Sequence, residues 1–168
     1  MSATRYLDLF LIALVCLAAV RDLMVRRISN RLVLTGLLAA LLLRLGADTP
    51  LAALLDGLAG AGVGLLIFLP LYLVRGMAAG DVKLMAMVGA FTGPALAFEI
   101  ALATCCIGGV MALAVVLARG RLRDTLDNMR ILLRPWLMRM IGVPLAPEPL
   151  SVRSVGGLPY GVAIALGT

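Results

Sequence analysis

The sequence predicts an all-α integral membrane protein, a polytopic bundle of about six transmembrane helices in one domain, residues 1–168. Hydrophobic residues make up 62% of the chain and charged residues only 14%, and the mean hydropathy is +1.08. Soluble proteins are about half apolar and about a quarter charged. The apolar residues form continuous runs, as membrane helices require, and do not alternate with polar residues as in a β-barrel.

Six apolar runs are expected to cross the bilayer, and a helix needs about 20 residues to do so. The runs cover residues 7–25, 32–45, 51–74, 81–98, 100–118 and 155–168. The second and the sixth run are short for a complete crossing. The Gly93-Pro94 pair predicts a break in the fourth run, and Glu99 is placed at the turn between the fourth and fifth runs.

The first run is interpreted as a retained helix and not as a cleaved signal peptide. No small-residue cleavage site follows it. Instead it ends at Arg21 and Asp22, with two further arginines at positions 26 and 27. Such a basic flank is typical of the cytoplasmic end of a membrane helix.

The distribution of Lys and Arg predicts that the N-terminus lies outside the cytoplasm. With that orientation, 13 of the 15 basic residues fall in inner segments, and only Arg5 and Arg44 fall in outer ones. Cytoplasmic loops of membrane proteins carry such an excess of Lys and Arg. The bias therefore favours an even number of spans.

The longest loop, residues 119–154, is expected to be cytoplasmic, basic and amphipathic. Apolar residues recur there at steps of three and four between arginines: Leu122, Leu126, Met129, Leu133, Trp136, Leu137 and Met140. This pattern is typical of a helix that lies on an anionic leaflet. Docking of a substrate is the alternative role for the same loop.

Gly60 and Gly64 form a G-x-x-x-G pattern in the third run. Small residues at this spacing let two membrane helices approach closely. The pattern predicts a helix contact, and it leaves open whether the partner is another span of this chain or a second protomer.

The composition argues against nucleic-acid, metal and cofactor sites. The net charge is +6, but the basic residues flank apolar runs, so topology and anionic lipid at the inner leaflet explain them better. Aromatic residues are 5% of the chain, too few for a base-stacking surface. The chain has no histidine, and its three cysteines form no C-x-x-C pair, so we expect no metal and no cofactor.

Two of the nine acidic residues differ from the others in their position. Asp22 ends the first run and Asp81 begins the fourth, and the predicted topology puts both on the inner side at a similar depth. Folding can therefore bring these two side chains together, although they are far apart in sequence.

Two facing carboxyl groups that are partly desolvated cannot both ionise easily. Repulsion and burial raise one pKa, so the pair shares a proton near neutral pH. The ionised member can then activate water while the protonated member polarises a peptide carbonyl. The alternatives are structural, because Asp22 could pair with Arg26 one turn away and Asp81 could cap its own helix.

Three short motifs resemble those of type IV prepilin peptidases, a family of GxGD aspartic membrane proteases. "AAGDVKL", residues 78–84, resembles the family's GxGDxK signature. "RDLMVRRISNRLVL", residues 21–34, looks like its other aspartate segment, an Asp followed by a basic run and an Ile-Pro-Asn-like turn. "LPYGVAIALG", residues 158–167, is similar to its closing Pro-(Phe/Tyr)-Gly segment. The three motifs occur in the family's order.

The resemblance implies that Asp22 and Asp81 are the catalytic pair and that no metal or cofactor takes part. It implies supporting roles for the other motif residues: Gly80, Lys83, Ala78, Arg27, Asn30, Pro159, Tyr160 and Gly161. Two positions depart from the family's pattern. Ala78 replaces the first glycine of GxGD, which bears on the local backbone, and Ser29 replaces the usual proline in the turn after the first span.

The resemblance also implies the reaction and its place. The chain is expected to be an aspartic endopeptidase of the bacterial inner membrane that removes the short basic leader of type IV prepilins at the cytoplasmic face. The short form looks most like the prepilin peptidases of Flp/Tad pilus systems, so cleavage without N-methylation is expected, and archaeal preflagellin peptidases are similar in size. A non-catalytic membrane scaffold and a small proton-coupled transporter using Asp22, Asp56 and Asp81 are the alternatives.

Overall fold

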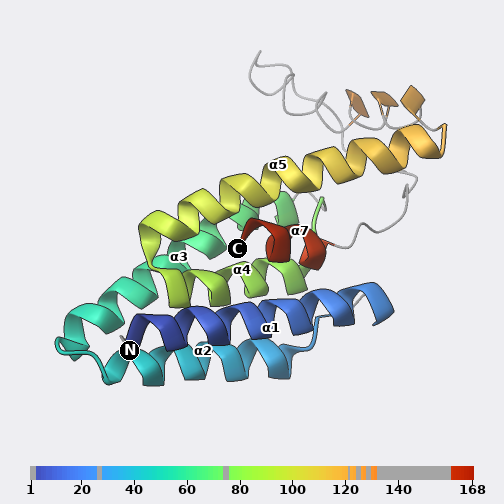
Figure 1. The fold of residues 1–168 in the computed structure, drawn as a ribbon. Helices are drawn as coiled ribbons and strands as arrows, with labels where there is room; N and C mark the ends of the chain where they lie inside the picture. Colours follow the sequence, from blue (N-terminus) through green and yellow to red (C-terminus); the bar gives the residue numbers. More distant parts are fainter. Residues whose placement is uncertain are drawn as a thin grey trace, which may run out of the picture. The chain divides into compact units, whose positions relative to one another are not determined.

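The computed structural model describes residues 3–25, 28–73, 76–120, 122–123, 126–127, 130–131 and 160–168. Within these ranges the chain is helical and contains no strand, which confirms the all-α class. The helices are α1 (Ala3–Val25), α2 (Asn30–Leu45), α3 (Pro50–Leu73), α4 (Ala79–Thr92), α5 (Pro94–Ala118) and α7 (Tyr160–Gly167), as Figure 1 shows.

Among the described residues, α3 and α5 are long and apolar enough to cross a membrane. These two helices support the interpretation as a membrane protein. The number of spans, their orientation and the outside position of the N-terminus stay predictions.

The chain divides into two compact units. One unit contains residues 1–108 and 159–168, and the other contains residues 109–158. In the second unit α5 ends at a turn in which Gly120 has a φ of 63°, and the described residues that follow are helical. Most of the predicted amphipathic loop at 119–154 lies outside the described residues.

Helix α4 is the centre of the first unit. It contacts α1, α2, α3 and α7, and Figure 1 shows it between α3 and α1. Its side chains are buried almost all the way round: Asp81, Val82, Leu84, Met85, Ala86, Met87, Val88, Gly89, Ala90 and Phe91. A helix that is apolar on every face forms the core of a bundle. The surrounding helices expose many large apolar side chains on their outer faces, as suits contact with lipid.

Glycines allow α3 to lie directly against the backbone of α4. A side chain at Gly60 would overlap the carbonyl oxygen of Gly89, and a Cβ at Gly64 would stand 2.5 Å from the carbonyl oxygen of Met85. The partner of the G-x-x-x-G pattern is therefore another helix of this chain.

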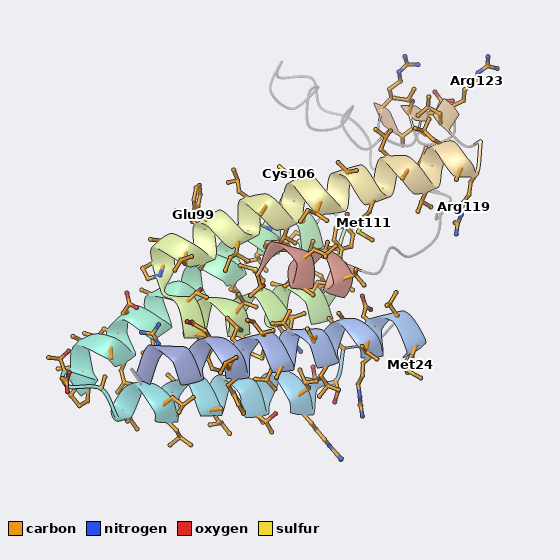
Figure 2. The ribbon with its side chains drawn as sticks, in the orientation of Figure 1. Met24, Glu99, Cys106, Met111, Arg119 and Arg123 are labelled. Carbon is orange, nitrogen blue, oxygen red and sulfur yellow. The ribbon has the colours of Figure 1, made fainter. Side chains whose placement is uncertain are left out.

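The turn between α4 and α5 lies earlier than the sequence indicates. Helix α4 ends at Thr92, Gly93 adopts a φ of 79°, and Pro94 is the first residue of α5. Proline suits the first turn of a helix, where its missing N–H is not needed. The expected turn at Glu99 is wrong, because Glu99 lies within α5 with an exposed side chain (Figure 2).

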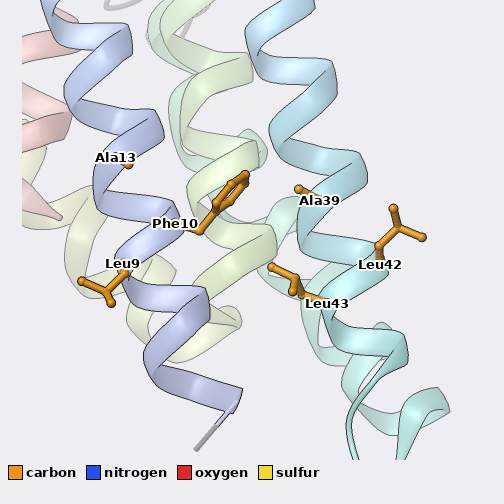
Figure 3. Close-up of a pocket in the computed structure, with 6 residues that line it drawn as sticks. All are labelled: Leu9, Phe10, Ala13, Ala39, Leu42 and Leu43. Carbon is orange, nitrogen blue, oxygen red and sulfur yellow. The ribbon is translucent and has the colours of Figure 1, made fainter. Parts of the chain in front are cut away.

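An apolar groove separates α1 and α2 (Figure 3). Leu9, Phe10 and Ala13 line it from α1, and Ala39, Leu42 and Leu43 line it from α2. Ala13 is nine residues from Asp22, which corresponds to about 13 Å along a helix. The groove is therefore separate from the two candidate acids.

The close contact of α3 and α4 predicts that alanine destabilises the protein at one glycine of α3 and is tolerated at another. Gly60→Ala should lower the free energy of unfolding by about 1–3 kcal/mol, because the added methyl group meets backbone that cannot move aside. Gly62→Ala is the matched control, because a Cβ at Gly62 meets nothing within 4 Å. Thermal unfolding in detergent, followed by circular dichroism, measures both, and equal stabilities would contradict the contact.

Candidate active site

The two acids singled out from the sequence lie at one end of the first unit. Asp22 is in the last turn of α1, and Asp81 is in the first turn of α4. Their exposed fractions are only 7% and 4%. Carboxyl groups this buried need a compensating partner or a function.

The fold brings Asp22 and Asp81 close enough for the charge of one to act on the other. The chain reverses direction between α1 and α2, between α2 and α3, and again before α4, so the end of α1 and the start of α4 share one end of the unit. Asp22 is the one buried residue among 21–25, so it alone in this turn is directed inward.

Helix α7 supplies the hydrogen bond to this pair. The backbone N–H of Gly161 donates to Oδ2 of Asp22 at 2.9 Å, between residues 139 positions apart in sequence. A Cβ at Gly161 would lie 2.9 Å from both Cβ and Oδ2 of Asp22. Only a residue without a side chain permits this approach, and this contact explains why the third residue of the Pro-Tyr-Gly motif is glycine.

Tyr160 is the second contact from α7. Its side chain is half-buried and close enough to Asp81 for an electrostatic interaction. Its ring lies against Gly108 of α5, where a Cβ would stand 2.8 Å from the ring carbon Cε1. The first two residues of α7 thus approach both candidate acids, Gly161 at Asp22 and Tyr160 at Asp81.

The other signature residues of α4 face the start of α2. Lys83 is exposed, and its Nζ donates to Oδ1 of Asn30 at 3.1 Å. Gly80 faces Ile28, whose Cβ would lie 3.1 Å from a Cβ at Gly80. Two predicted support residues, Lys83 and Asn30, are therefore partners, and Gly80 makes room for the turn that leads into α2.

The two departures from the family's pattern fit the observed backbone. Ala78 precedes α4 with φ −81° and ψ 150°, a conformation open to any L-residue. Ser29 precedes α2 with a φ of −70°, which is also the angle that proline would impose. Neither position requires glycine or proline. The remaining support residues, Arg27 and Pro159, lie outside the described residues.

Sequence reasoning missed a charge cluster that joins a buried arginine to an exposed aspartate and involves the opposite end of α4. Nη1 of Arg44 lies 2.8 Å from Oδ2 of Asp56, and Arg44 is only 8% exposed. The guanidinium group also donates to the carbonyl oxygens of Ala53, Ala90 and Phe91.

The cluster has an identifiable sequence signal. Arg44 ends the second predicted span, and Asp56 lies inside the third, and the predicted topology puts both on the same side. Opposite charges within membrane segments usually pair with each other or with backbone carbonyls. A count of charges on each side of the membrane does not by itself identify Arg44 as the partner of Asp56.

A comparison with known families agrees with the location of these motifs. The model of the type IV leader peptidase family matches residues 9–113, which contain Asp22 and Asp81 but not Tyr160 and Gly161. No curated protein and no solved structure gives a match to the chain. Since the matched region is more than half of the sequence, the chain belongs to the type IV leader peptidase family, whose members are prepilin peptidases.

Proposed function

We propose that this chain is a membrane aspartic endopeptidase that uses Asp22 and Asp81 to cleave the leader of a type IV prepilin. The observation that carries this proposal is the pair of buried carboxyl groups, which interact with each other at one end of the first unit. Membership of the leader peptidase family supports the prepilin as substrate.

The pair suits peptide hydrolysis without another reactive group. Two carboxyl groups in a shared, desolvated site hold one proton between them. The ionised group takes a proton from water as the water oxygen attacks the peptide carbonyl. The protonated group stabilises the oxygen of that carbonyl, and the protons then return as the peptide C–N bond breaks.

The position of the pair at helix ends suits a bond at the membrane surface. Water reaches the end of a bundle more readily than its middle. We propose that the protein lies in a bacterial inner membrane with this end facing the cytoplasm. The short basic leader of the substrate lies on the same side and precedes an apolar helix in the membrane. The scissile segment must be extended, because a helical peptide bond is shielded by its neighbours, and a leader that ends in glycine opens more easily.

The finer specificity also belongs to the proposal. Cleavage of Flp-like prepilins without N-methylation rests on the resemblance of the short form to Flp/Tad peptidases. The backbone at Ala78 supports activity despite the missing first glycine of the signature, because its φ of −81° strains no L-residue.

A proton-coupled transporter is a weaker interpretation of the same acids. In that alternative, a proton path would join Asp22, Asp81 and Asp56. Asp56 instead pairs with Arg44, whose guanidinium group also binds carbonyls in the last turn of α4, whereas Asp81 is in its first turn. The scaffold alternative is decided by the cleavage experiment below.

Replacing either acid by its amide should abolish cleavage. In Asp22→Asn and in Asp81→Asn the pair can no longer both activate water and supply a proton, so we expect a loss of at least about 10³-fold in kcat/KM. Cleavage of a co-reconstituted Flp-like prepilin is measured by the mobility shift of the product. Asp48→Asn, at an exposed acid, is the matched control and should keep full activity. Undiminished cleavage in either of the first two variants would contradict the proposed function.

The contact of Gly161 with Asp22 predicts that even a methyl group is harmful there. Gly161→Ala should reduce kcat/KM by about 10- to 100-fold, because the new Cβ displaces either α7 or the Asp22 carboxyl group. Gly109→Ala is the control, since a Cβ at Gly109 meets nothing within 4 Å. The same prepilin assay compares the two, and equal activities would show that α7 does not position Asp22.

A further inference from the structure

Arg44 extends from α2 to the end of α4, and the proposed mechanism makes no use of it. Its Nε donates to the carbonyl oxygen of Ala90 at 2.8 Å, and its Nη2 donates to that of Phe91 at 3.0 Å. Its Nη1 donates to the carbonyl oxygen of Ala53 and to Oδ2 of Asp56, each at 2.8 Å. The residue is only 8% exposed. A buried guanidinium group with four contacts is held in one place, and it holds its partners in turn.

Two of these contacts satisfy the C-terminal end of α4. The last four carbonyl groups of a helix have no partner within it. The carbonyl oxygen of Gly89 accepts from the N–H of Gly93 at 2.9 Å. The carbonyl group of Ala90 has no such partner, because the residue four positions further is Pro94, which has no N–H. Arg44 supplies the missing donor from another helix, and its positive charge suits the C-terminal end of α4.

We propose that Arg44 is a positioning residue for the endopeptidase. By binding the last carbonyl groups of α4, it fixes the position of that helix along its axis and keeps Asp81 beside Asp22. This inference rests on the proposed function and deepens it. Ala90 is nine residues from Asp81, which corresponds to about 13 Å along a helix. Arg44 therefore does not touch the reacting groups and acts on them through α4.

The contact of α3 with α4 does not by itself fix this axial position. Gly60 and Gly64 set the distance between the two helices, but they insert no side chain between the turns of α4. A shift by one residue would move Asp81 by about 1.5 Å along the axis and would leave buried carbonyl groups without a donor. At the start of α4, the hydrogen bond from Lys83 to Asn30 is exposed and competes with water. The guanidinium group is the stronger axial restraint.

Gly57 of α3 leaves the space through which Arg44 reaches α4. A Cβ at Gly57 would lie 2.7 Å from Cδ and 2.8 Å from Nε of Arg44, and 3.1 Å from the carbonyl oxygen of Ala90. The closest atoms belong to a flexible side chain, which moves more readily than backbone. Gly57→Ala should therefore displace the guanidinium group from the end of α4 while its positive charge stays in the protein.

The first experiment compares Gly57→Ala with Gly62→Ala, a matched control on the same helix, where a Cβ meets nothing within 4 Å. Cleavage of a co-reconstituted Flp-like prepilin is measured per folded molecule, with the folded fraction taken from circular dichroism. Gly57→Ala should lower kcat by about 10- to 100-fold, the loss expected from a small displacement of the reacting groups. KM should stay unchanged, because Arg44 lies at the end of α4 opposite the acids. Equal kcat values for the two folded variants overturn the proposal.

Arg44→Lys tests the geometry of the contact. Lysine keeps the charge, but its single nitrogen cannot replace the planar guanidinium fork that binds both carbonyl oxygens of α4. We expect kcat per folded molecule to fall by about 10-fold or more, again with KM unchanged. Arg31→Lys, at an exposed arginine of the same helix, is the matched control and should keep full activity. Wild-type kcat in Arg44→Lys would overturn the positioning role of the guanidinium group.

A third measurement needs no activity and so separates this proposal from the endopeptidase function. Cysteines are introduced at positions 22 and 81 of a chain whose three native cysteines are replaced by serine, and they form a disulfide only where the two positions lie side by side. Gly57→Ala should slow the closure of this disulfide, and Gly62→Ala should not. Equal rates overturn the role of Arg44. Cleavage that persists in Asp22→Asn or Asp81→Asn would instead end the endopeptidase proposal, whatever the rates of closure show.

Discussion

The site depends on one constraint, which is the packing of α4 on every side. Glycines on α3 bring two backbones into direct contact, and the end of α4 is held by the guanidinium group of Arg44. A helix confined in this way cannot slide or rotate to expose Asp81 to lipid. The first turn of α4 therefore presents its acid to the end of α1, where Asp22 lies, and the energy of packing offsets the cost of burying two carboxyl groups.

Helix α7 completes the arrangement from a distant part of the sequence. It has only eight residues, Tyr160–Gly167, yet its first turn approaches both acids. The matched family region ends at residue 113 and does not contain this turn. The contact of Gly161 with Asp22 thus links the Pro-Tyr-Gly motif to the aspartate motifs by a physical interaction. The sequence shows only that the three motifs occur in the family's order.

Much of this was accessible from the sequence, because hydropathy and charge are strong signals in membrane proteins. The helical class, the break at Gly93 and Pro94, and the family follow from the sequence, and the structure and the family comparison bear them out. The start of α5 was missed because residues 94–98 are as apolar as the helix before them, so hydropathy does not separate the two. The partner of Arg44 and the contact of Gly161 were missed because each joins residues on different helices. Local patterns carry no information about such pairs.

The central claim is that residues 22 and 81 meet, and disulfide trapping in membranes tests it most directly. The background chain has Cys16, Cys105 and Cys106 replaced by serine, and cysteines are then introduced at positions 22 and 81. Mild oxidation should cross-link this pair as rapidly as cysteines at positions 28 and 80, because a Cβ at Gly80 would lie 3.1 Å from the Cβ of Ile28. A pair at positions 22 and 56 should not react. Absence of the 22–81 cross-link under conditions where the 28–80 pair closes would contradict the account.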